Sequence, residues 1–125
     1  METLNKSITG TEVLYYFLRV ARIECINSVD VQDLNNKMEL LLQLPEFSSI
    51  KPAFYIGDKF SMLYAIQSLI ETEAVTKYQN ELMLSMPIDE GVHELPQKTK
   101  LMYLNMARLY RTIGNTKECI QKGND

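Results

Sequence analysis

Residues 11–27 carry apolar side chains on two sides of a predicted helix. The apolar residues form two stripes at helical spacing, Leu14, Phe17, Leu18, Ala21 and Cys25 in one and Val13, Tyr16, Val20 and Ile23 in the other. Thr9 or Thr11 supplies the N-cap, and Glu12 lies near the positive end of the helix dipole. Because both stripes must be covered, this helix needs neighbours on two sides. The pattern predicts an inner helix of a bundle or of a stacked array.

The rest of the chain also has helical periodicity. A second helix is predicted to begin at Asp30 and to end before Pro45. Residues 59–86 contain neither Gly nor Pro, so we expect one long helix there, unless a bend at residues 71–73 divides it into two hairpin arms. After a polar loop, a last clear helix is predicted from Gln97 to Ile113. The expected fold class is therefore all-α, with about five helices in antiparallel hairpins.

Residues 45–57 interrupt this pattern with two prolines and a glycine, yet they are rich in large apolar side chains. Loops exposed to water are seldom so apolar, and soluble proteins rarely display large apolar patches. We therefore expect this segment to fold back over the core.

Residues 100–121, KLMYLNMARLYRTIGNTKECIQ, place large and small side chains at fixed offsets. The large ones are Tyr103, Met106 and Tyr110, the small ones are Ala107 and Cys119, and a turn is offered by Gly114-Asn115. This segment resembles the first helix and turn of a tetratricopeptide repeat. The resemblance implies a helical-repeat fold. No matching turn recurs 34 residues upstream, so an irregular helical bundle is the alternative.

The second helix of that repeat would be unfinished at Asp125. Residues 1–125 are therefore expected to form a single helical domain, and the initial Met favours the N-terminal part of a larger helical-repeat protein.

In tetratricopeptide proteins the first helix of each unit lines a groove for peptides or partner helices. By this resemblance, the partner-binding residues are Leu101, Leu104, Asn105, Arg108 and Arg111. Arg108 and Arg111 are i, i+3 neighbours that can clamp a carboxylate. The predicted function is a non-enzymatic scaffold domain and complex subunit that binds another protein. A self-associating bundle, a structural homodimer that pairs through the first helix or the 47–56 loop, is the alternative.

The sequence offers little for catalysis. Its one histidine, His93, lies in the acidic loop, and neither Cys25 nor Cys119 belongs to a metal-ligand or redox motif. No phosphate-binding glycine motif is present. We therefore predict no enzyme, no cofactor and no metal. A small helical enzyme that uses His93 or a cysteine is the third alternative.

Charge and hydrophobicity restrict the partners. The formal net charge is -3, which gives no general attraction to nucleic acid. No apolar run has the length of a membrane span, and the N-terminus does not resemble a secretory signal. The expected location is intracellular, cytoplasmic or nuclear, with a protein as partner and with neither nucleic acid nor membrane.

Overall fold

The computed structural model describes residues 8–85 and 96–124, with side chains described up to residue 113. Within these residues, the α-helices are α1 (Gly10–Ile23), α2 (Val31–Leu41), α3 (Leu63–Glu71) and α4 (Gln97–Asn124). The strands are β1 (Val29–Asp30), β2 (Tyr55–Ile56), β3 (Lys59–Phe60), β4 (Val75–Tyr78) and β5 (Glu81–Leu84). The fold is thus mixed α/β, and the prediction of an all-α helical repeat is wrong.

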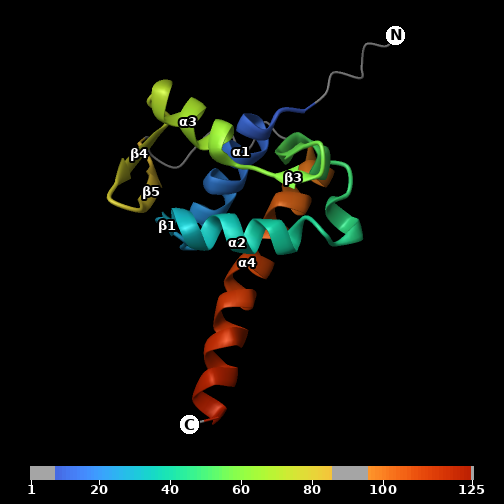
Figure 1. The fold of residues 1–125 in the computed structure, drawn as a ribbon, viewed down its shortest axis with the longest axis vertical. Helices are drawn as coiled ribbons and strands as arrows, with labels where there is room; N and C mark the ends of the chain where they lie inside the picture. Colours follow the sequence, from blue (N-terminus) through green and yellow to red (C-terminus); the bar gives the residue numbers. More distant parts are fainter. Residues whose placement is uncertain (1–7, 86–95, 125) are drawn as a thin grey trace.

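Helix α1 is the central element, as its two apolar stripes predicted. It packs on α3 and on α4 (Figure 1). Thr9 and Glu12 form a capping box at its start: the Glu12 N–H donates to the Thr9 hydroxyl at 3.1 Å, and the Thr9 N–H donates to the Glu12 carboxylate at 3.1 Å. These bonds satisfy N–H groups that the first turn leaves without helical partners.

Helix α2 begins where the sequence predicted. The Asp30 carboxylate accepts a hydrogen bond from the Asp33 N–H at 3.0 Å, so Asp30 is the N-cap. The helix ends at Leu41, a turn earlier than Pro45 alone would require.

The predicted long helix over residues 59–86 is replaced by α3 and a β-hairpin. Helix α3 ends at Glu71, and Glu73 has a φ of 63°, a left-handed conformation that turns the chain out of the helix. Strands β4 and β5 then pair antiparallel, with Val75 opposite Leu84, and β1 completes a three-stranded sheet in the order β1-β5-β4. The absence of Gly and Pro was a poor guide, because β-branched and aromatic residues after position 74 favour strand.

The segment after α2 folds back over the core, as predicted. It contains two 3-10 helices, η2 (Pro45–Phe47) and η3 (Lys51–Phe54), and the β2–β3 hairpin. Phe47, Ile50 and Phe54 are buried in the main core cluster. Gly57 takes a φ of 64° in the hairpin turn, a conformation that side-chain-bearing residues rarely adopt.

Helix α4 overturns the repeat assignment. It runs without interruption through Gly114-Asn115, where a tetratricopeptide repeat would turn into its second helix. Its first half packs against α1 and α2, whereas its second half extends away from the body (Figure 1). A helix tolerates an interior Gly at a cost of about 1 kcal/mol relative to Ala, so Gly-Asn alone does not force a turn.

The side of α4 that is buried in the core is the side that the sequence pattern predicted. Tyr103, Met106, Ala107 and Tyr110 are all buried. The buried residues were thus placed correctly although the all-α helical-repeat fold was not, because a packing pattern of large and small side chains is shared by many amphipathic helices.

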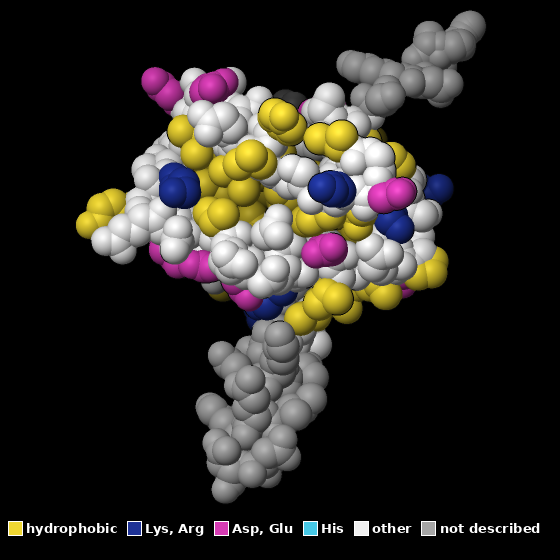
Figure 2. Space-filling view, viewed as in Figure 1, with side chains coloured by type: hydrophobic (Ala, Val, Ile, Leu, Met, Phe, Trp, Pro, Cys, Tyr) yellow, Lys and Arg dark blue, Asp and Glu magenta, His cyan; other side chains and the backbone are white. Residues whose placement is uncertain are grey.

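Hydrophobic side chains also reach the surface of the body. Figure 2 shows them gathered in a hollow below α3 and beside the β4–β5 hairpin. The most exposed large hydrophobic side chains include those of Leu63, Tyr64, Tyr78, Ile56 and Leu40. Single exposed apolar residues are common on proteins, so clusters of them are the informative cases.

Candidate functional site

The structure places three of the five predicted partner-binding residues, Leu101, Asn105 and Arg108, on the side of α4 opposite its buried side. Leu101, Asn105, Arg108 and Arg111 are exposed, and Leu104 is half-buried against the core. Leu101, Asn105 and Arg108 follow one another at spacings of four and three residues and so share one face of the helix. Leu104 and Arg111 lie toward one flank of that face.

A groove of about 580 Å³ lies between the start of α4 and the chain around η2. We call it the α4 groove, and its lining residues are Glu46, Phe47, Ser49, Lys98, Thr99, Leu101, Met102 and Asn105. Of the predicted residues, Leu101 and Asn105 reach it, whereas Leu104, Arg108 and Arg111 do not line it.

The wall of the α4 groove that faces α4, formed by Glu46, Phe47 and Ser49, was not predicted from the sequence. Pro45 at the start of η2 sets the backbone angle of its first residue, and burial of Phe47 holds this turn on the core. The apolar residues of the loop signalled packing, but they did not indicate that α4 would lie beside it. That pairing joins segments about fifty residues apart.

Arg108 is held beside α1 rather than over the α4 groove. Its Nε lies 3.5 Å from the Glu24 carboxylate, at the C-cap of α1. Arg108 is 58% exposed and Glu24 is 20% exposed, so water still screens the pair, and it contributes about 1 kcal/mol or less. Glu24 therefore competes weakly with any carboxylate that Arg108 and Arg111 would clamp together.

A polar cluster fixes α4 on α2. The Tyr110 hydroxyl donates to Asp33 Oδ2 at 3.1 Å, and Lys37 Nζ lies 3.1 Å from the same oxygen. The ammonium also lies 4.5 Å from the centre of the Tyr110 ring. Burial, reinforced by the negative charge of Asp33, raises the pKa of Tyr110 far above its usual range. Tyr110 therefore stays protonated and keeps donating this bond.

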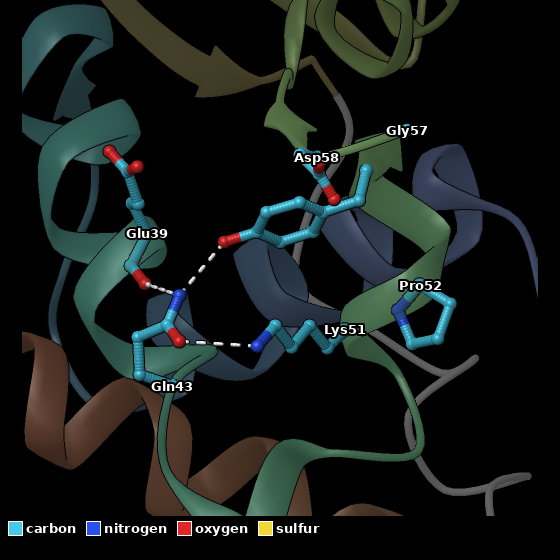
Figure 3. A pocket seen from close by; sticks show the side chains of 7 residues that line it. Glu39, Gln43, Lys51, Pro52, Gly57 and Asp58 are labelled. Carbon is cyan, nitrogen blue, oxygen red and sulfur yellow. Dashed lines mark hydrogen bonds between the residues drawn. The ribbon is translucent and has the colours of Figure 1, made fainter.

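A second groove, of about 560 Å³, lies between the end of α2 and the β2–β3 turn (Figure 3). Lys51 Nζ donates to Gln43 Oε1 at 3.1 Å, and Gln43 Nε2 donates to the Tyr55 hydroxyl at 2.9 Å. Glu39 and Asp58 also line the groove, and their carboxylates make no ion pair with any described residue. Most of the lining side chains are exposed, so a small ligand would remain largely hydrated, unlike one in an enclosed site.

The predicted catalytic candidates gain no support from the described part of the chain. His93 and the side chain of Cys119 lie outside the described residues, and Cys25 is an exposed free thiol. Within the described residues, no three His, Cys, Asp or Glu side chains gather closely enough to hold a metal ion. None of the described helices combines the length and hydrophobicity of a bilayer-crossing segment.

Comparisons with protein-family models, with curated proteins and with solved structures find no match to this chain. Its function must therefore be argued from the surface chemistry.

Proposed function

We propose that this chain is a non-enzymatic protein-interaction domain that takes a peptide or a helix of a partner protein into the α4 groove. One observation carries the proposal. Leu101, a large apolar side chain that is 46% exposed, stands on the wall of a groove whose apolar lining also includes Phe47 and Met102. Covering such a side chain with a partner removes apolar surface from water.

The composition of the α4 groove suits a polypeptide. Apolar side chains line part of it, and polar groups surround them, with Lys98 and Glu46 supplying opposite charges and Asn105 supplying an amide. Protein interfaces combine an apolar centre with a polar rim in this way. An apolar anchor of the partner would enter beside Leu101 and Phe47, while its backbone or polar side chains would meet Asn105.

Arg108 and Arg111 would act at the rim of this interface. Both are exposed, and Arg108 already has a partner in Glu24. Rim charges mainly affect the association rate and its salt dependence. We therefore assign them to steering an acidic partner and assign affinity to Leu101.

The charges of the body favour a protein over nucleic acid. A helix that reads DNA in the major groove needs side chains that reach base edges, and its domain needs Lys and Arg for the phosphates. Helix α3 has a solvent-exposed side, but Glu71 is its only charged residue. The whole chain has a net charge of -3.

Self-association is the second candidate, although the surfaces first expected to mediate it are mostly covered. Most apolar residues of α1 are buried by α3 and α4, with Ile23, 44% exposed, as the exception, and Phe47, Ile50 and Phe54 are buried as well. Ile56 is the exception in that loop.

The α4 groove is tested by installing a photoreactive phenylalanine analogue at position 101 in the full chain, expressed in its native cells. The matched control carries the analogue at Leu40, which is 57% exposed on α2 and lines neither groove. A partner that cross-links from position 101 and not from position 40 is then produced as a pure protein for calorimetry.

Leu101→Asp should weaken binding of that partner at least about tenfold. Complete burial of a Leu side chain is worth about 1.5–3 kcal/mol, so burial of its exposed half contributes about 1 kcal/mol, and an unpaired carboxylate in the interface adds to the loss. Leu40→Asp should bind like wild type. Equal cross-linking from both positions, or unchanged affinity of Leu101→Asp, would rule out this groove.

A further inference from the structure

A second surface carries two of the most exposed large hydrophobic residues in the described chain, Ile56 and Tyr64, and the similarly exposed Leu63 precedes Tyr64 in the sequence. Ile56 is 59% exposed, Leu63 67% and Tyr64 71%. Ile56 and Tyr64 line one small cavity of about 140 Å³, so they are close in space although they belong to β2 and α3. Leu63 adjoins Tyr64 in the first turn of α3. Clustered exposed hydrophobics of this kind mark interaction surfaces.

This cluster continues into an apolar groove between α1 and α3. A further cavity of about 210 Å³ is lined by Thr11, Glu12, Tyr15, Leu69, Thr72 and Ala74. Thr11 lines both cavities, and the lining residues from α3 and its C-cap run from Tyr64 to Thr72. At 1.5 Å per helical residue, this length of α3 is about 12 Å. We call these two neighbouring cavities, which share Thr11, the α3 groove. A partner helix lying along it would make contact over about two turns.

The two ends of the α3 groove differ in charge. Glu12 is the only charged residue on the walls of either cavity, and Glu71 and Glu73 flank Thr72 at the same end. The Arg19 guanidinium lies 5.0 Å from the centre of the Tyr15 ring, but Arg19 is buried and presents little positive surface. The end near Ile56 and Tyr64 is apolar, and the end near Glu12 is acidic.

We propose that the α3 groove binds an amphipathic helix of a partner protein, with apolar side chains at positions i, i+3 or i+4, and i+7, followed or preceded by Lys or Arg. The apolar side chains of the partner would cover Ile56 and Tyr64 and would enter the cavity that Leu69 lines, as in other helix-in-groove complexes. The basic residue would meet the acidic end. Complementary charge also fixes the direction in which the helix lies.

The inference does not depend on the α4 groove, because the two grooves share no lining residue. Failure at one groove therefore leaves the other open to its own test.

The probe is a phage-displayed library of helix-forming 14-residue peptides, selected on the full chain in solution. Enriched peptides should share the apolar spacing and carry a Lys or Arg near one end. They should bind Tyr64→Asp at least tenfold more weakly than wild type. Tyr78→Asp is the matched control, since Tyr78 is 68% exposed at the β4–β5 hairpin. It should bind like wild type, and so should Leu101→Asp.

Replacing Glu71 and Glu73 together by Gln tests the acidic end while keeping side-chain size. Affinity should fall severalfold at low salt, and the salt dependence of binding should decrease. A selection that enriches no peptide, or peptides that bind Tyr64→Asp as well as wild type, would overturn the proposal. So would enriched peptides without basic residues. Sedimentation that shows a wild-type dimer and a monomeric Tyr64→Asp would assign the surface to a second copy of the chain and would also overturn it.

Discussion

Tyr103 and Tyr110 are buried tyrosines on the same side of α4 that differ in the partner of the hydroxyl group. The Tyr110 hydroxyl donates to Asp33 Oδ2 at 3.1 Å. The Tyr103 hydroxyl is buried without a hydrogen-bond partner among the described residues. The same substitution, Tyr to Phe, should therefore have opposite effects on the free energy of unfolding at these two positions.

The expected sizes follow from the surroundings. A hydrogen bond to a charged group contributes about 1.5–3 kcal/mol, and the lower end applies to Tyr110→Phe because Asp33 keeps its ion pair with Lys37 at 3.1 Å. Tyr103→Phe removes a buried polar atom that gains nothing from folding, so stability should rise by about 1 kcal/mol. The two variants should differ by about 2.5 kcal/mol, or roughly 10 °C in Tm for a chain of this size.

Urea unfolding at pH 7, followed by circular dichroism at 222 nm, measures this difference. The m values should agree with that of wild type, so that a shift of the midpoint reports stability alone. Each substitution removes only a hydroxyl and leaves the aromatic ring, so the packing of the ring should change little, and to a similar extent, in the two variants. If the variants agree within about 0.5 kcal/mol, or if Tyr103→Phe is the less stable, the contrast between a satisfied and an unsatisfied hydroxyl is refuted.

Three further predictions concern stability. Burial raises the pKa of both Tyr103 and Tyr110 above the unfolded value of 10.0, so the folded chain keeps protons that the unfolded chain releases. The free energy of unfolding should therefore be constant with respect to these two groups below pH 10 and should fall above pH 10 by about 1.4 kcal/mol per pH unit for each tyrosine. Urea midpoints at pH 9, 10 and 11 measure this loss. Thr9→Ala should cost about 1 kcal/mol through loss of the α1 cap, whereas Thr9→Ser should retain most of it. Gly10→Ala should cost about 1–3 kcal/mol by thermal unfolding, because the added Cβ would lie 2.8 Å from the Ala53 backbone oxygen; a neutral result would show that η3 moves freely.

Local features of the sequence were sufficient to place several helix boundaries and the buried side of α4. Thr9 and Asp30 are caps whose partners lie three residues away, so a short window contains the whole interaction. The stripe of Tyr103, Met106, Ala107 and Tyr110 repeats at helical spacing and is buried as expected. Gly114-Asn115 misled because a turn signal competes with the helix around it, and here the helix continues.

The sheet and the grooves depended on contacts that no short window contains. Val29 of β1 pairs with Leu82 of β5, fifty-three residues away, and without β1 the hairpin would have only its own two strands to stabilise it. The candidate sites show the same limit. Leu101 and Asn105 were predicted through the tetratricopeptide resemblance and line the α4 groove, but the residues around Phe47 that complete the groove were not predicted.

The sequence by itself determined most of the residues that leave water: the two stripes of α1 as far as Ala21, the inner side of α4 and the apolar loop after α2. The predicted stripes extended too far, because α1 ends at Ile23 and both Ile23 and Cys25 are exposed. Apolar spacing and local caps express these preferences within a few residues. Only the tertiary structure decided that residues 75–84 form a hairpin, and that the grooves join α4 to η2 and α1 to α3. Strand pairing and groove formation depend on which distant segments meet, and that outcome is set by the free energy of the whole packed chain.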